Sequence, residues 1–225
     1  ASLLTGPIRP QLIRMTLTLM VGMLTMMSFN LLDTWFIAQL GTVPLAAISF
    51  TFPITFSLIS LTIGMSVGTS AILGRYLGQG RLDEAKRKAS AALMCAFGFM
   101  VLGGGAGLLW SEALFVAMGA DQQALPLILS YMSIWFAGCG LLAVSMVGNA
   151  IFRAFGNTRI PSGIMVAASV VNAVLDPVLI FGLGPVPALG IQGAAIASLI
   201  AWTCGCGLML WMLWFRHRLL SWRQF

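Results

Sequence analysis

The fold class is decided by residues 12–37, LIRMTLTLMVGMLTMMSFNLLDTWFI, a segment that is apolar over nearly all of its length. A helix needs about 20 apolar residues to cross the hydrocarbon core of a bilayer, so this segment is long enough to span it. Further segments of the same kind follow it at 45–73, 89–110, 125–152, 161–183 and 191–215. The sequence therefore predicts an all-α membrane protein, built as a bundle of six transmembrane helices.

The composition supports this prediction and excludes a soluble protein. Hydrophobic residues make up 59% of the 225 residues, and charged residues make up only 8%. Soluble globular proteins have roughly 45–50% apolar and 25% charged residues. With so few charges the chain cannot cover a water-facing surface, so lipid must contact most of its exterior.

The positive charges indicate how the spans are oriented. The chain has 12 Lys and Arg residues, and all of them lie before or at the start of the first span, between spans two and three, between spans four and five, or after the sixth. In the opposite connections, the only charged residues are acidic, Glu112 and Asp121. Because cytoplasmic loops are enriched in Lys and Arg, this pattern predicts that both termini are cytoplasmic. No basic stripe with interleaved aromatic residues is present, so no nucleic-acid partner is expected.

Two acidic residues, Asp33 and Asp176, lie inside predicted spans. A carboxylate in the hydrocarbon core costs at least about 2.5–3.5 kcal/mol, so such a residue indicates a functional site. Asn30 shares a helical face with Asp33, and Asn172 lies one turn before Asp176. Carboxylate and amide oxygens suit either Na⁺ or a carboxyl group that binds a proton. No other metal site and no cofactor are expected.

The depths of four polar side chains suggest that they meet. Asp33, Tyr131, Asp176 and Ser198 come from four different spans. Counted at 1.5 Å per helical residue, each lies about 12 Å from the end of its span opposite the basic loops. We therefore expect one polar cavity in the outer half of the bilayer. A cavity with an acid and aromatic walls suits a lipophilic cation.

Two local patterns concern helix packing. Gly64 and Gly68, and Gly103 and Gly107, are small residues four apart, a spacing that lets membrane helices approach closely. Pro53 lies inside the second span, where it is expected to kink the helix.

Several stretches in a fixed order resemble the multidrug and toxic compound extrusion (MATE) transporters. They are Asn30-Leu-Leu-Asp33-Thr34 with Gly41, Gly74-Arg-Tyr-Leu-Gly78-Gln-Gly80-Arg-Leu-Asp-Glu-Ala85-Lys86, Phe155-Gly-Asn-Thr-Arg159-Ile-Pro161, Asn172-Ala-Val-Leu-Asp176-Pro177 and Gly190-Ile-Gln-Gly193-Ala-Ala-Ile-Ala-Ser198. The resemblance covers essentially the whole chain, but only the N-terminal one of the family's two six-helix lobes. It implies that residues 1–215 form this lobe and that residues 216–225 begin the cytoplasmic inter-lobe linker.

The resemblance also implies a function. The protein would be a multi-pass protein of the bacterial plasma (inner) membrane that exports cationic or amphipathic drugs in exchange for H⁺ or Na⁺, without ATP. Its partner would be a second six-helix lobe, either in the same polypeptide or as a second copy of the chain.

The family's functional positions carry over to this chain residue by residue. The ion-coupling positions would be Asp33, Asn172, Asp176 and Ser198, although the family usually has threonine at the last of these. Asn30 and Tyr131 would line the substrate cavity. A proline that the family usually has in the first span is replaced here by Thr18.

Three alternative functions remain open at this point. A flippase for lipid-linked saccharides, from the same superfamily, would need cationic groups to hold a pyrophosphate, and no predicted span contains one in its interior. An intramembrane aspartyl protease would use two aspartates that share a proton. Here the sequences before Asp33 and Asp176, Leu31-Leu32 and Val174-Leu175, lack the Gly-x-Gly-Asp and Tyr-Asp contexts expected of such proteases. In a purely structural role, both aspartates would only pin helices together.

Overall fold

The computed structural model describes residues 8–182 and 187–220, apart from the side chains of Ile8, Pro10, Gln11, Arg14, Met26, Phe29 and Asn30. Its elements are α1 (Ile8–Ala38), α2 (Thr42–Gly78), α3 (Leu82–Ala117), α4 (Leu125–Ala154), α5 (Arg159–Phe181), α6 (Ile191–Trp211) and the short π-helix η1 (Met212–Arg216). No strand occurs in these described ranges. The predicted all-α fold is confirmed.

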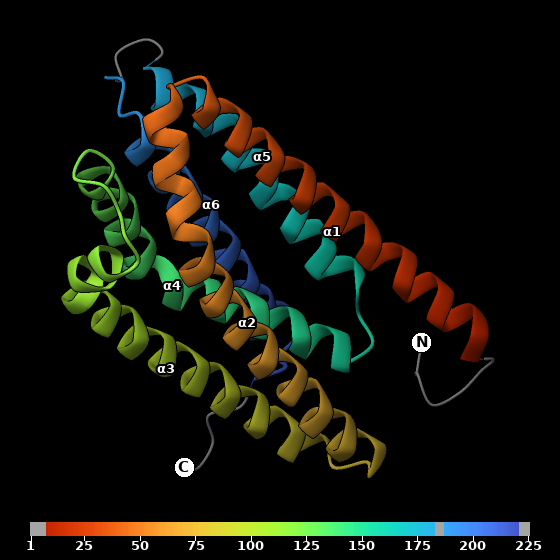
Figure 1. Ribbon diagram of the computed structural model, residues 1–225. Helices are drawn as coiled ribbons and strands as arrows, with labels where there is room; N and C mark the ends of the chain where they lie inside the picture. The colour runs from red at the N-terminus through yellow and green to blue at the C-terminus, as the bar shows by residue number, and fades with distance from the viewer. Residues whose placement is uncertain (1–7, 183–186, 221–225) are drawn as a thin grey trace.

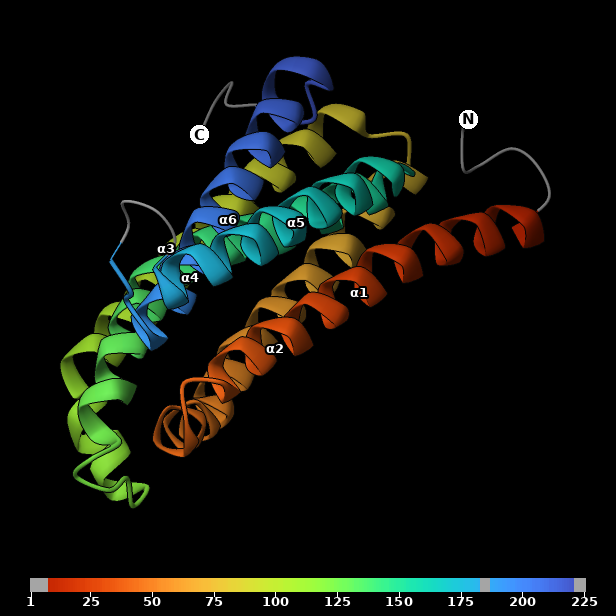
Figure 2. The same cartoon turned by 90° about the horizontal axis from the view of Figure 1, so that it is seen from above.

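Helix α4 lies at the centre of the bundle and packs against α2, α3 and α6 (Figure 1). Helix α5 packs against α6 on one side and α1 on the other. Helix α2 packs against α3 as well as α4, whereas α1 and α2 diverge from the turn that joins them (Figure 1 and Figure 2). We call the end that carries the α2–α3 and α4–α5 turns the basic end, because Arg81, Lys86, Arg87, Arg153 and Arg159 lie there.

Five of the described helices are long and apolar enough to cross a membrane: α2, α3, α4, α5, and α6 taken together with η1. Within α1, the apolar stretch that the structure describes is shorter, Met15–Thr25. Many large apolar side chains face outward, among them Leu31, Leu102 and Leu109, which are 72%, 76% and 81% exposed. Such a surface is stable in contact with lipid tails and unfavourable in water.

Helices α2 and α3 extend beyond the predicted spans of 45–73 and 89–110. The extra turns contain Arg, Lys, Glu, Leu and Ala, which favour helix even where the sequence is too polar for the bilayer core. Each helix stops at a glycine with positive φ, Gly80 (73°) for α2 and Gly119 (84°) for α3. After each glycine, the next backbone N–H bonds back to a carbonyl five residues earlier, as Ala120 does to Phe115 at 3.0 Å.

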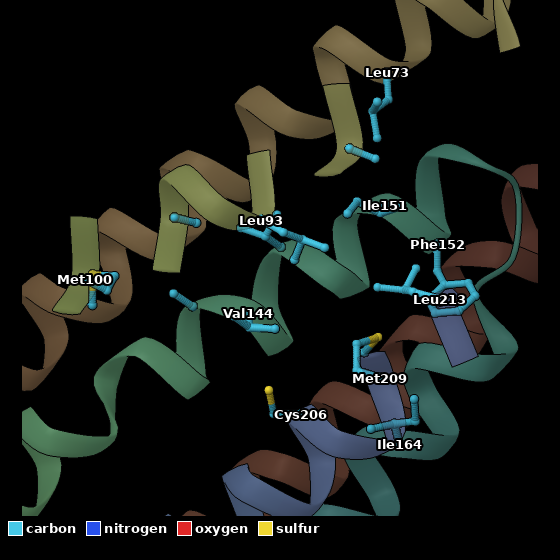
Figure 3. Close-up of a cluster of buried hydrophobic side chains, with 14 of the residues drawn as sticks. Leu73, Leu93, Met100, Val144, Ile151, Phe152, Ile164, Cys206, Met209 and Leu213 are labelled. Carbon is cyan, nitrogen blue, oxygen red and sulfur yellow. The ribbon is translucent and has the colours of Figure 1, made fainter. Parts of the chain in front are cut away.

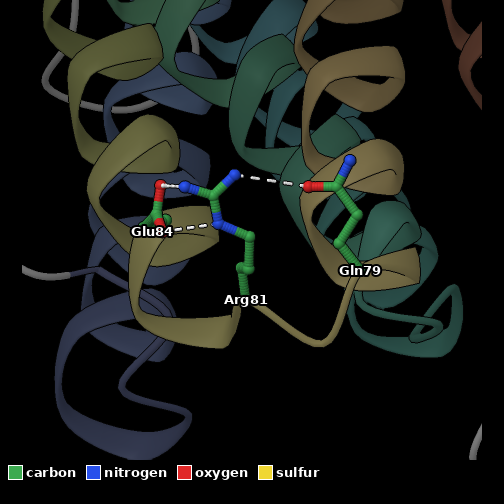
Figure 4. A network of polar contacts seen from close by, with 3 residues as sticks. All are labelled: Gln79, Arg81 and Glu84. Carbon is green, nitrogen blue, oxygen red and sulfur yellow. Dashed lines mark hydrogen bonds and ion pairs between the residues drawn. The ribbon is translucent and has the colours of Figure 1, made fainter.

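Polar side chains stabilise the turn between α2 and α3. Arg81 donates to both carboxylate oxygens of Glu84 at 2.6 Å and to Oε1 of Gln79 at 3.4 Å (Figure 4). Its guanidinium also lies 5.2 Å from the ring centre of Tyr76. These contacts join the last turn of α2 to the first turn of α3, so the two helices leave the turn in a defined direction.

The core at the basic end is a cluster of buried side chains from α2, α3, α4, α5, α6 and η1 (Figure 3). Leu73, Met100, Phe152, Met209 and Leu213 in this cluster are all fully buried. Lipid tails are as apolar as these side chains, so burial from water does not drive helices together inside a membrane. Close packing between side chains must therefore hold this core together.

Of the four glycines predicted to allow close helix packing, only Gly107 has a close neighbour in the described part of the chain. Gly107 of α3 lies so close to the ring of Phe136 on α4 that an added Cβ would be 2.6 Å from its Cδ1 atom. At Gly64 and Gly68 of α2, an added Cβ would meet nothing within 4 Å. The spacing of Gly64 and Gly68 predicted that this face of α2 packs closely against another helix, but within the described part of the lobe no helix packs there. At Pro53, α2 continues as one helix.

We predict that Gly104→Ala separates α3 from α4 and destabilises the lobe. The added Cβ would overlap the backbone oxygen of Phe136 and lie 2.6 Å from Sγ of Cys139, and a backbone atom cannot move aside cheaply. We expect a loss of about 1–3 kcal/mol, measured as a lower melting temperature of the full-length protein in detergent.

The matched control is Gly103→Ala, one residue earlier on α3. A Cβ there meets nothing within 4 Å, so stability should stay equal or rise. Equal melting temperatures for the two variants would contradict the packing of α3 on α4.

Candidate functional site

A cavity of about 380 Å³ opens between α1, α2, α4, α5 and α6. The predicted site residues Asp33, Tyr131, Asn172 and Ser198 all line it. Asp176 is fully buried and lies behind this lining, in contact with Asn172. The side chain of Asn30, predicted to line a substrate cavity, lies outside the described residues.

The centre of the site is a hydrogen-bonded group from α5 and α6, formed by Asn172, Asp176 and Ser198. Nδ2 of Asn172 donates to Oδ1 of Asp176 at 3.1 Å, and its contact with Oγ of Ser198 measures 3.4 Å. The one-turn spacing on α5 and the predicted depth of Ser198 therefore bring these three side chains together. We call them the amide–carboxyl cluster.

The amide–carboxyl cluster leaves buried oxygen atoms unused. Oδ2 of Asp176 is buried and has no hydrogen-bond partner among the described residues, and the same holds for Oδ1 of Asp33. A buried carboxylate oxygen without a partner is costly. A proton or a hard cation would remove that cost.

Asp33 and Tyr131 approach the amide–carboxyl cluster from α1 and α4. The carboxyl groups of Asp33 and Asp176 lie close enough to interact electrostatically, and each also interacts with the phenol of Tyr131. Two carboxylates repel each other in a low-dielectric site, so the pair is most stable when a positive charge or a proton is shared with it. Among the described residues, no group of three or more His, Cys, Asp or Glu side chains forms a transition-metal site.

Apart from Asp33, the described residues that line the cavity carry no charge, and several of them are aromatic. Trp135 of α4 and Trp202 of α6 meet edge to face, with ring centres 4.7 Å apart. Phe52 and Phe56 of α2 also line the cavity, and they are 53% and 70% exposed. None of the described lining residues is Lys, Arg or His. The cavity therefore offers negative charge and aromatic faces, a combination that attracts an organic cation.

The cavity also has polar lining residues that were not predicted from the sequence: Thr51, Thr55, Ser145 and Asn149. Asn149 is only 6% exposed, and its Oδ1 atom has no hydrogen-bond partner in the described part of the chain. Asn149 was not predicted from the sequence, because a neutral amide does not interrupt an apolar run as a charged residue does. The signal was present, because Ser145 and Asn149 are four apart and share a face of α4.

Thr18, at the position where the resemblance places a proline, packs against α5. Its backbone carbonyl accepts a hydrogen bond from Oγ of Ser162 at 2.9 Å. Gly22, one turn later on α1, has no side chain, and a Cβ there would lie 3.4 Å from the Cα of Ser162. These contacts hold α1 against α5 at the basic end of the lobe.

Comparisons with known proteins agree on the architecture. The MatE family model matches residues 18–178. An FAD transporter from Shewanella oneidensis is 45% identical over 219 residues, which cover 97% of this chain and 48% of that protein.

Two solved structures cover 95–97% of this chain and 48% of their own chains. One is an outward-facing multidrug resistance MATE family transporter, with 29% identity and a TM-score of 0.91. The other is the Vibrio cholerae MATE transporter VcmN in its bent form, with 33% identity and a TM-score of 0.88. The chain therefore spans about half the length of these proteins.

We predict that Asn172→Leu destabilises the lobe more than Ser198→Ala does. Removing the amide leaves both oxygens of Asp176 buried without a hydrogen bond, which costs about 1–3 kcal/mol. Ser198 makes only the longer, 3.4 Å contact, so its loss should change stability by less than about 0.5 kcal/mol.

Thermal unfolding of the full-length protein in detergent measures the difference. If both variants unfold at the same temperature, Asn172 does not support Asp176 as described.

Proposed function

We propose, on the premise that this chain belongs to the MATE family of membrane transporters, that it forms one lobe of a secondary transporter. The lobe would export small molecules in exchange for H⁺ or Na⁺ and would require no cofactor. Its relatives are about twice as long, which supports a second six-helix lobe as its partner. That lobe would belong to the same polypeptide or to a second copy of this chain.

The observation that carries the proposal is that two buried carboxylate oxygens, Oδ2 of Asp176 and Oδ1 of Asp33, have no hydrogen-bond partner among the described residues. Within a membrane bundle, such a pair needs a proton or a cation to be stable. When the ion leaves, the pair becomes negative and attracts a cationic solute. When the ion returns, that attraction is lost. One site thus links the binding of the two, which is the requirement for exchange transport.

The cavity favours cationic or amphipathic solutes. The acids supply charge, and Trp135 and Trp202 supply ring faces and edges for a flat organic molecule. A saccharide pyrophosphate would need Lys or Arg in the cavity, and the described lining has none. Proteins of this family are transporters rather than enzymes, so the protease alternative is not retained.

Export of a flavin dinucleotide is a second candidate, because the Shewanella oneidensis relative at 45% identity is an FAD transporter. The aromatic walls suit the planar flavin ring. FAD also carries two phosphates, and this lobe presents acids rather than cations to the cavity. Any positive groups that bind those phosphates would therefore come from the second lobe.

We predict that Asp33→Asn and Asp176→Asn each abolish coupled export, because an amide cannot take up and release the ion. The measurement is efflux of the fluorescent cation ethidium from cells that express the full-length protein, with membrane insertion checked by blotting. Glu112→Gln, at an exposed position near the end of α3, removes a comparable charge and should export normally. Normal ethidium export by either aspartate variant would refute the site.

We also predict which solute is carried, using proteoliposomes that contain the full-length protein. Uptake of ethidium, driven by an outward gradient of H⁺ or Na⁺, should exceed uptake of FAD under the same gradient. The reverse order would replace the multidrug proposal with flavin export and would leave the ion site intact.

A further inference from the structure

The cavity runs through most of the thickness of the lobe. Along α4 its lining extends from Tyr131 to Asn149. Eighteen residues at 1.5 Å each give a length of about 27 Å, close to the roughly 30 Å of a bilayer core. The cavity therefore connects the level of the amide–carboxyl cluster with the region near the basic end.

Two unsatisfied polar groups lie in the part of the cavity nearer the basic end. Oγ of Ser145 and Oδ1 of Asn149 are buried and have no hydrogen-bond partner in the described part of the chain. The two residues are one turn apart, and both line the cavity. An amide oxygen and a hydroxyl in this position require a hydrogen-bonding guest.

Helix α2 does not supply that guest, because the hydroxyl that reaches this part of α4, Oγ of Ser70, donates to the backbone oxygen of Ala150 at 3.4 Å. Thr62 and Ser66 of α2 are buried, and their hydroxyls donate to carbonyls of their own helix at 2.7 and 2.8 Å. The other lining residues at this depth, Ile164 and Met209, offer no polar atoms that could bond to Asn149.

The chemistry of the pair suits water. A buried water molecule typically makes two to four hydrogen bonds and occupies about 30 Å³, so the cavity has room for several. The pair carries no charge and therefore holds a passing ion weakly. Weak binding lets an ion leave a site as readily as it enters. The carboxyl groups retain the ion, whereas a neutral amide and hydroxyl release it.

We propose that Asn149 and Ser145 hold water in the half of the lobe nearer the basic end, and that this water carries the coupling ion between the amide–carboxyl cluster and the basic end. The inference rests on the proposed exchange of solute for an ion. It adds a route for that ion and assigns it to side chains on α4 that do not belong to the cluster.

The test uses the full-length transporter in proteoliposomes and measures ion flux and solute affinity separately. Proton flux is followed with a pH-sensitive dye in the lumen, sodium flux with radioactive sodium, and affinity with ethidium and FAD at equilibrium. Asn149→Leu keeps the size of the side chain and removes the amide. We expect the flux of the coupling ion to fall about tenfold, a larger factor than the change in either solute affinity.

Three further variants control the result. Asn149→Ser restores a polar group with space for water and should recover most of the flux, and Ser145→Ala should lower flux in the same direction as Asn149→Leu. Thr62→Val removes a buried hydroxyl that is already bonded within α2 and should leave flux unchanged.

Unchanged flux in both Asn149→Leu and Ser145→Ala would overturn the proposal. A loss of ethidium or FAD affinity with normal ion flux would also overturn it, since Asn149 would then belong to the solute site. Asp33→Asn is measured in parallel to separate the two hypotheses. Flux retained in Asp33→Asn refutes the proposed function, whereas flux retained only in the two α4 variants refutes the water route.

Discussion

The carboxyl group of Asp176 lies fully buried in a membrane helix, where one oxygen accepts a hydrogen bond from Asn172 and the other has no hydrogen-bond partner among the described residues. This arrangement would be unstable in a rigid apolar bundle, because an intramembrane carboxylate is costly when nothing neutralises it. Much of the lobe reduces that cost. Helix α5 places the amide one turn away and α6 brings Ser198 to the same amide, whereas the second acid, from α1, adds repulsion. An exchanged ion would neutralise the negative charge that these contacts leave uncompensated.

Helix α4 makes this arrangement possible by filling the centre of the lobe. Along its length its small residues let neighbouring side chains approach closely, as Gly138 does for Leu199 and Gly148 does for Met209. Its larger residues fill the two cores on either side of the cavity. Because membrane helices gain little from leaving lipid, this close fit holds the five helices around the polar cavity. The polar side chains are thereby kept away from lipid, and open space remains between them as the cavity.

The sequence predicted the spans and the amide–carboxyl cluster because both depend on large energetic contrasts. A long run of apolar residues indicates a membrane span directly. An acid inside such a run, as at Asp33 or Asp176, carries a large free-energy cost and is therefore easily recognised. Other features depend on weaker contrasts and were missed. Hydropathy marks the membrane rather than the helix, so the predicted span of 89–110 does not include the first seven residues of α3. Small-residue spacing does not say which face has a partner, so Gly64 and Gly68 were assigned a contact that they lack. A neutral amide such as Asn149 costs less to bury in an apolar span than a carboxylate does. It was therefore recognised as a site residue only from its position in the cavity lining.

The central claim is that solute and ion are linked through the Asp33–Asp176 pair. The most direct measurement adds the transported solute, ethidium or FAD, to the wild-type full-length protein in weakly buffered detergent solution. Released protons are followed with an indicator dye and released Na⁺ with a selective electrode. The claim predicts that solute binding releases one of the two ions, and that solute affinity falls as that ion's concentration rises. Solute binding that releases neither ion, with an affinity independent of both pH and Na⁺, would contradict it.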